Sequence, residues 1–296
     1  MPRCLSFLLS LALFAGASFA APPARIISTA PSITEILYAL GLGDRVAAVT
    51  RFCRYPPEAQ SKPKIGDYVN PNLEAMAALR PDLVVIQTNP VRLADRLNAL
   101  RMKSLEVDQQ NLQAIYKSIR DIAVATGSEK QAAALIGAMR TKLRAVGDRS
   151  AKLPRVKTMF VVGRAPGRLD GLIVVGSASY LNEMLALAGG TNIFSDAIAS
   201  YPQVSLEEVL ARNPDVIIDI GEMGDGPQVG DGGQVITARR QSIIALWQRA
   251  NTVKAVKEHR VYPVGADIFV VPGPRAVNAA EEIFAMLHPA EGRGTK

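Results

Sequence analysis

Two glutamates stand in matching surroundings in the two halves of the sequence. Glu74 belongs to segment 72–86, NLEAMAALRPDLVVI, and Glu207 belongs to segment 205–219, SLEEVLARNPDVIID, 133 positions later. Asn72 and Ser205 are good N-cap residues, so each glutamate is expected at the second position of a short helix that ends before a Pro-Asp pair and a buried strand. A carboxylate there stabilises the helix dipole by about 0.3–1 kcal/mol. Its repetition on two related segments predicts, in addition, two anchor points for one partner.

Other groups that do chemistry are few. The sequence has neither a G-x-S-x-G elbow nor a G-x-x-x-x-G-K-[ST] phosphate loop, so we do not predict an enzyme. An exported hydrolase or chelatase is the alternative of another class, and turnover of a ligand would distinguish it. His259 and His288 are the only histidines, and two are too few for a multi-histidine metal site. We expect both of them at the surface. No metal ligand and no catalytic residue is predicted.

The first twenty residues, MPRCLSFLLSLALFAGASFA, differ in character from the rest. Arg3 precedes an apolar run, and Ser18-Phe19-Ala20 has the small-x-small pattern of a cleavage site. We predict a signal peptide over 1–20, cleaved after Ala20, and a periplasmic protein that does not itself span the membrane. Cleavage leaves Cys53 as the only cysteine, so no intrachain disulfide is expected. The net charge of +7 is scattered without an aromatic-interleaved basic patch, which disfavours nucleic acid as a partner.

The chain alternates short apolar runs with helical segments, which predicts parallel sheets buried on both faces. Strands are expected at 25–28, 45–50, 83–87, 104–107, 156–162, 216–220 and 260–264, and helices at 72–79, 93–100, 112–126, 179–188, 205–211, 243–250 and 272–286. Residues 128–146, SEKQAAALIGAMRTKLRAV, form the longest uninterrupted helical segment.

A second repeat lies at the first helix of each half. Thr34-Glu35-Ile36-Leu37 before Gly41 is similar to Asn182-Glu183-Met184-Leu185 before Gly189, at an offset of 148. Ser32 and Glu35 are expected to form a capping box. The fold class is therefore α/β, with two Rossmann-like lobes of mainly parallel sheet, joined by one long rigid helix, and a cleft between them. We predict lobes at 21–127 and 151–296, with the joining helix at 128–150.

The order of several segments resembles a known family. APSITEILYALG, YPPEA, KIGDYVNPNLEAMAALRPDLVV, LALAGGTNIF, YPQVSLEEVLARNPDVII and VKEHRVYPV follow one another as in the periplasmic binding proteins of ABC importers that have a rigid inter-lobe helix. The resemblance covers nearly all of 25–287 and is closest to the cobalamin-binding branch. It implies capture of cobalamin (vitamin B12) or a related corrinoid and delivery to a permease dimer, with Glu74 and Glu207 engaging permease arginines. It implies no cofactor besides the transported ligand.

The resemblance also implies the residues of the ligand cleft, which should follow the ends of the strands. These are Phe52, Tyr55, Tyr68, Tyr201, Asp267 and Phe269. Aromatic side chains would stack on a flat tetrapyrrole, and Asp267 would hydrogen-bond to its polar periphery. Cys53, beside Phe52, is expected to be a partly buried free thiol.

The sequence departs from the cobalamin-binding pattern at several positions. Tyr68 and Tyr201 stand where tryptophan is usual, Val271 stands where an arginine is expected, and the glycine-rich segment 221–233 has no counterpart. Gln87 and Ile268 also replace expected aromatic residues. Haem, with Tyr68 as an iron ligand, is therefore the first alternative, and a ferric siderophore is the second.

Overall fold

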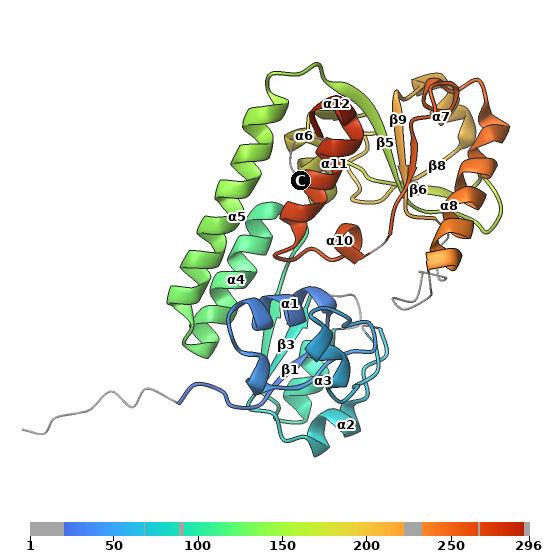
Figure 1. The fold of residues 1–296 in the computed structure, drawn as a ribbon. Helices are drawn as coiled ribbons and strands as arrows, with labels where there is room; N and C mark the ends of the chain where they lie inside the picture. Colours follow the sequence, from blue (N-terminus) through green and yellow to red (C-terminus); the bar gives the residue numbers. More distant parts are fainter. Residues whose placement is uncertain (1–20, 68, 89–91, 222–232, 266, 293–296) are drawn as a thin grey trace, which may run out of the picture.

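The computed structural model describes residues 21–67, 69–88, 92–221, 233–265 and 267–292, and it confirms an α/β fold with two sheets (Figure 1). Sheet A is fully parallel, and its strand order is β2-β1-β3-β4. Its strands are β1 (Ile26–Ser28), β2 (Val46–Ala48), β3 (Leu83–Gln87) and β4 (Ser104–Val107). The connecting helices are α1 (Pro31–Ala39), α2 (Leu73–Ala78) and α3 (Leu93–Ala99), with short 3-10 turns at Gly43–Arg45 and Pro57–Ser61.

Sheet B is mainly parallel and has the strand order β10-β9-β5-β6-β8. The first half of β5 (Val156–Gly163) pairs with the parallel β7 (Gly190–Asn192), and its second half pairs with the antiparallel β6 (Leu172–Val174). The other strands are β8 (Gln203–Val204), β9 (Val216–Asp219) and β10 (Val261–Pro263). The short strands β6, β7 and β8 were not expected from the sequence pattern, because two or three residues give no measurable periodicity.

The long helix α5 (Glu129–Ser150) stands between the two sheets in chain order, and α4 (Leu112–Thr126) and α11 (Ala276–Leu287) both pack against it (Figure 1). The remaining helices are α6 (Tyr180–Leu187), α7 (Leu206–Arg212), α8 (Gly233–Trp247), α9 (Lys254–Lys257), α10 (Asp267–Val270) and α12 (Pro289–Gly292), with a 3-10 turn at Gln248–Ala250. We call the part before α5 the N-lobe and the part after it the C-lobe. The lobe limits expected from the sequence stay a prediction.

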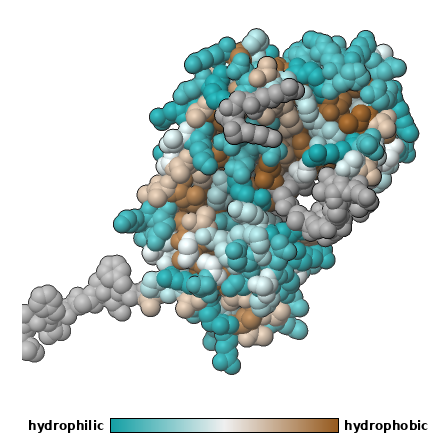
Figure 2. All heavy atoms as spheres, in the orientation of Figure 1, coloured by the Kyte–Doolittle hydropathy of each residue, from teal (hydrophilic) through white to brown (hydrophobic). Residues whose placement is uncertain are grey.

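One buried cluster reaches from one sheet to the other, and we call it the inner core. It joins Ile26 and Val85 of sheet A and Phe160 and Ile218 of sheet B through the apolar faces of α1, α4, α5, α6 and α11. Neighbouring strand residues point the other way, toward separate outer clusters, as the two-residue period of a strand requires. Most of the face drawn in Figure 2 is hydrophilic, with apolar atoms visible mainly in its central part and at the upper right.

The outer face of sheet B is closed around Trp247, the only tryptophan in the sequence. Its side chain is fully buried, and its Nε1 donates to Oδ2 of Asp219 over 2.7 Å. Asp219 also accepts from the Gly221 backbone N–H over 2.6 Å and lies 3.4 Å from Nε of the buried Arg164. These partners compensate for the burial of the Asp219 carboxylate at the end of β9.

Candidate functional site

A cavity of about 780 Å³ opens where the lobes meet. The N-lobe contributes Glu35 and Tyr38 of α1 together with Tyr55 and the turn that follows it, and the C-lobe contributes Arg275 and its neighbours. Its volume lies in the range of small-molecule sites, which are usually about 300–1,000 Å³. Of the four predicted ligand-binding side chains that the structure describes, only Tyr55 lines this cavity, and Phe52, Tyr201 and Phe269 do not.

The predicted capping box of α1 is wrong. The helix begins at Pro31 after Ala30, which has no side chain to serve as a cap, so Ser32 lies inside the helix. The Ser32 hydroxyl instead donates to Oε1 of the buried Gln109 over 2.5 Å. Glu35 is also buried, and its Oε1 accepts from Nη2 of Arg275 over 2.5 Å. Both side chains are therefore used in tertiary contacts rather than at the start of their own helix.

Three aromatic side chains of the predicted set are exposed. Phe52 is 47% exposed, Tyr55 is 45% exposed and Tyr201 is 46% exposed, whereas the other aromatic residues in the described ranges are buried or half-buried. The guanidinium of Arg51 lies 4.9 Å from the ring centre of Phe52, and that of Arg275 lies 4.1 Å from the ring centre of Tyr55. An exposed aromatic ring backed by a cation presents its other face for stacking.

The start of α6 organises the C-lobe part of the predicted site. Ser179, the N-cap of α6, lies with its hydroxyl 3.2 Å from the hydroxyl of Tyr201. The next residue, Tyr180, donates its buried hydroxyl to the backbone oxygen of Phe269 over 2.7 Å. Burial raises the pKa of Tyr180 well above its usual range, which keeps this phenol protonated and able to donate.

Phe269 is placed differently from the other aromatic residues of the set. Its side chain is only 1% exposed, and it meets Phe160 edge-to-face with ring centres 5.4 Å apart. In this structure the Phe269 ring therefore packs in the core and is not itself available to a ligand. Tyr68, segment 222–232 and the side chain of Asp267 lie outside the described residues, so the predictions made for them stay predictions.

Within the part of the chain that the structure describes, the Cys53 thiol and the two histidines do not form a metal site. Cys53 is fully buried against Thr34 and Thr50, and burial raises the pKa of its thiol. His259 is exposed as expected, whereas His288 is partly buried beside Phe284, with ring centres 5.2 Å apart. No three potential metal-ligating side chains gather anywhere in the described ranges.

The two repeated segments fold alike. The Asn72 side chain accepts from the backbone N–H of Ala75 over 2.9 Å at the start of α2, and Ser205 accepts from that of Glu208 over 3.2 Å at the start of α7. Glu74 and Glu207 occupy the second position of these helices, and both are exposed. Figure 1 shows α2 and α7 at opposite ends of the molecule.

The agreement continues beyond the helices. Arg80 and Asn213, which precede the two prolines, have left-handed backbones with φ of 45° and 46°. The aspartates of the two Pro-Asp pairs then hold the neighbouring strands. Asp82 accepts from the backbone N–H of Arg25 over 2.8 Å, and Asp215 accepts from that of Lys157 over 3.1 Å. The repeat thus places each exposed glutamate at the same position of a helix that is capped and followed by the same backbone turn in its lobe.

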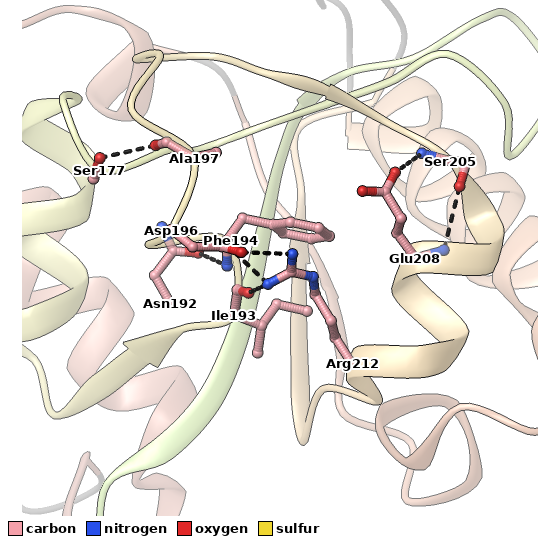
Figure 3. Close-up of polar contacts among 9 residues, drawn as sticks. All are labelled: Ser177, Asn192, Ile193, Phe194, Asp196, Ala197, Ser205, Glu208 and Arg212. Carbon is pink, nitrogen blue, oxygen red and sulfur yellow. Dashed lines mark hydrogen bonds and ion pairs between the residues drawn. The ribbon is translucent and has the colours of Figure 1, made fainter.

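The second copy has additional support, shown in Figure 3. Ser205 and Glu208 form the predicted capping box, so Glu207 is not needed for that purpose. At the other end of α7, Arg212 donates to both carboxylate oxygens of Asp196, over 3.0 and 2.8 Å, and to the Ile193 carbonyl. These bonds lower the pKa of Asp196. They also tie α7 to the loop that leads to Tyr201, a link that no local sequence signal indicates.

Comparison with known proteins gives one family. The family model described as periplasmic binding protein matches residues 26–268. An uncharacterised ABC transporter substrate-binding lipoprotein of Bacillus subtilis, YvrC, is 32% identical and aligns with 90% of this chain and 81% of its own. The vitamin B12-binding protein of Vibrio campbellii is 29% identical, and the alignment covers 96% of this chain and 96% of that protein.

Solved structures agree with these relatives. The periplasmic vitamin B12-binding protein BtuF of Vibrio cholerae has a TM-score of 0.74 at 27% identity, with 91% of this chain and 98% of BtuF covered. The periplasmic haem-binding protein RhuT of Roseiflexus also has a TM-score of 0.74, at 26% identity, with 90% and 98% covered. Within the described ranges, no helix combines the length and the apolar character needed to cross a membrane.

Proposed function

Because the chain belongs to the periplasmic binding protein family, we propose that it captures cobalamin or a related corrinoid between its lobes and delivers it to the permease of an ABC importer. The observation that carries this proposal is the exposure of three aromatic rings, Phe52, Tyr55 and Tyr201, in a chain whose other described aromatic residues are covered. A corrin offers flat apolar faces on which such rings stack. The similarity to vitamin B12-binding proteins supports the same ligand class.

Haem is the second candidate. The similarity to RhuT favours it about as well as the similarity to BtuF favours a corrinoid, since the two TM-scores are equal. A haem carrier would use Tyr68 as a phenolate ligand to iron, and a phenolate needs a nearby cation to lower its pKa. No basic residue adjoins Tyr68 in the sequence, although Arg51 pairs over 2.6 Å with Asp67, the residue before it. The vitamin B12-binding relatives therefore make the corrinoid the better supported ligand. A ferric siderophore is the third candidate.

Export and docking complete the proposal. Residues 1–20 would direct the chain to the periplasm and be removed after Ala20. Glu74 and Glu207 would then meet positively charged residues on the two halves of a permease dimer, because both are exposed on matching turns at opposite ends of the molecule.

Separate titrations of the purified protein with cyanocobalamin and hemin test the ligand, with absorption spectra and calorimetry as readouts. Stoichiometric binding of cyanocobalamin, weakened about tenfold by Tyr55→Ala or Tyr201→Ala through lost stacking, supports the corrinoid. Val124→Ala, at an exposed position on α4, is the control. Binding of hemin, with absorption bands that disappear in Tyr68→Phe, would instead identify haem as the ligand. Binding of neither would leave a siderophore or another chelate.

A further inference from the structure

We propose that Glu35 and Glu183, at matching positions on the first helix of each lobe, cross the lobe boundary and fix the angle between the lobes, and that Arg275 transmits this position to Tyr55. The first part stands without any ligand. The second part, which concerns affinity, rests on the proposed function.

The contact of Glu35 begins in the N-lobe and ends in the C-lobe. Its carboxylate, 2% exposed, pairs over 2.5 Å with Arg275, which is 16% exposed and 240 residues away. The C-lobe backbone also lies close to α1 at Gly273. A Cβ on Gly273 would lie 3.3 Å from Oε2 of Glu35 and 3.6 Å from Cα of Ser32. Because both groups are largely shielded from water, the attraction between them is screened less than that of a surface ion pair.

The contact of Glu183 runs in the opposite direction. Its Oε1 accepts over 2.9 Å from the backbone N–H of Leu112, the first residue of α4 in the N-lobe. That N–H has no acceptor within its own helix, and the N-terminus of a helix favours a carboxylate. Asn111 caps Ala114 instead, over 2.8 Å, so Glu183 supplies a bond that α4 does not provide for itself.

The two contacts have the same form. Arg275 is the N-cap residue of α11 and Leu112 is the first residue of α4, so each glutamate reaches the beginning of a helix of the other lobe. Both of these helices pack along α5. The lobes are thus connected by α5 and, in addition, by two reciprocal polar contacts, and any large rotation must break at least one of these contacts.

Arg275 links this frame to the proposed ligand site. Its guanidinium pairs with Glu35 and also lies 4.1 Å from the ring centre of Tyr55. Tyr55 belongs to the N-lobe, so a C-lobe side chain supports one face of its ring. Opening of the lobes would withdraw that support. Arg275 is therefore a positioning residue for Tyr55.

Distances between spin labels at Leu100→Cys in the N-lobe and Leu210→Cys in the C-lobe test the first part in ligand-free protein. Both positions are exposed, whereas Cys53 is buried and less reactive. We expect Glu183→Met to broaden the distance distribution, and Glu183→Gln, whose amide oxygen still accepts from Leu112, to restore it. Glu281→Met, at an exposed position on α11, is the matched control and should change nothing.

Testing the Glu35 contact requires removal of both charges, because removal of Glu35 alone would deprive the largely shielded Arg275 guanidinium of this carboxylate. The combined variant Glu35→Met with Arg275→Met avoids this and should still fold. We expect it to broaden the distribution as Glu183→Met does. Unchanged distributions in both variants would overturn the proposed frame.

The second part is tested by Arg275→Lys, which keeps the charge near Glu35 but loses the flat group beneath Tyr55. We expect unchanged label distances and a three- to tenfold weaker affinity for cyanocobalamin. Equal affinity would overturn the role of Arg275 in positioning Tyr55. If the unmutated protein binds neither cyanocobalamin nor hemin, the proposed function fails, while the ligand-free distances still decide the first part.

Discussion

Individual side chains of this protein are placed by polar contacts from far along the chain. The hydroxyl of Tyr201 meets Ser179, and the ring of Tyr55 lies over Arg275. Tyr55 and Tyr201 nevertheless remain 45% and 46% exposed, which leaves part of each ring available for stacking on a flat ligand.

Tyr201→Phe and Tyr201→Ala separate stacking from hydrogen bonding. We expect Tyr201→Phe to retain affinity for cyanocobalamin within about threefold, since the ring remains. Tyr201→Ala should lose about tenfold, because a stacked ring contributes roughly 1–1.5 kcal/mol. Calorimetry measures both values. Equal losses in the two variants would show that the hydroxyl, rather than the ring, is what the ligand needs.

His288 gives the fold a dependence on pH. Burial lowers its pKa, and a hydrogen bond with the backbone of Ala188 only partly opposes this shift. The folded pKa is thus below the unfolded value of about 6.5, so the stabilisation is complete above that pH and is lost as the pH falls through the folded pKa. We expect the unfolding free energy of His288→Phe, measured by urea denaturation, to fall less between pH 7 and pH 5 than that of the parent protein. His259→Asn, an exposed control, should keep the parent's dependence.

At the scale of elements, the loop between β7 and β8 carries Tyr201 and is fitted tightly to the end of β6. A Cβ on Gly176 would lie 2.0 Å from the Ala199 carbonyl oxygen and 2.9 Å from Pro202. The backbone N–H of Gly176 also donates to Ser200 over 2.9 Å. Only glycine permits this approach.

Gly176→Ala should therefore displace the loop and its aromatic residue together. We expect a loss of about 1–3 kcal/mol in unfolding free energy, as in other overpacked sites, and weaker binding of cyanocobalamin. Thermal denaturation and calorimetry provide the two values. Gly137→Ala, where a Cβ meets nothing within 4 Å, is the control and should not weaken binding.

Sequence patterns predict those elements whose signals are local. Asn72 and Ser205 directly precede the helices that they cap, and a proline follows each helix within a few residues, so the repeat could be interpreted in detail. Ser32 and Glu35 have an equally clear local pattern, but distant partners, Gln109 and Arg275, determine their roles. The burial of Phe269 likewise depends on Phe160, a contact that no spacing reveals.

At the scale of the whole molecule, the helices α2 and α7, which carry the exposed Glu74 and Glu207, lie at opposite ends of the structure (Figure 1). A rigid frame would keep that separation constant. A partner with two fixed basic sites can then recognise it, and charge complementarity would orient the encounter.

Glu74→Ala combined with Glu207→Ala tests this docking surface. We expect ligand affinity to remain within about twofold and ligand uptake by cells to fall at least tenfold, since both anchors are lost. Transport assays and calorimetry measure these quantities. Glu106→Ala with Glu281→Ala removes the same number of exposed carboxylates elsewhere and should leave uptake unchanged. Uptake unaffected by the first pair would remove the docking assignment.

The position of Trp247 makes the protein its own optical reporter. The sole indole lies in the C-lobe, so its fluorescence follows the unfolding of that half alone, whereas far-ultraviolet circular dichroism follows helices in both halves. Because the inner core extends through both sheets, we expect the two signals to share one urea midpoint. The emission of a single residue would then report the survival of the entire chain.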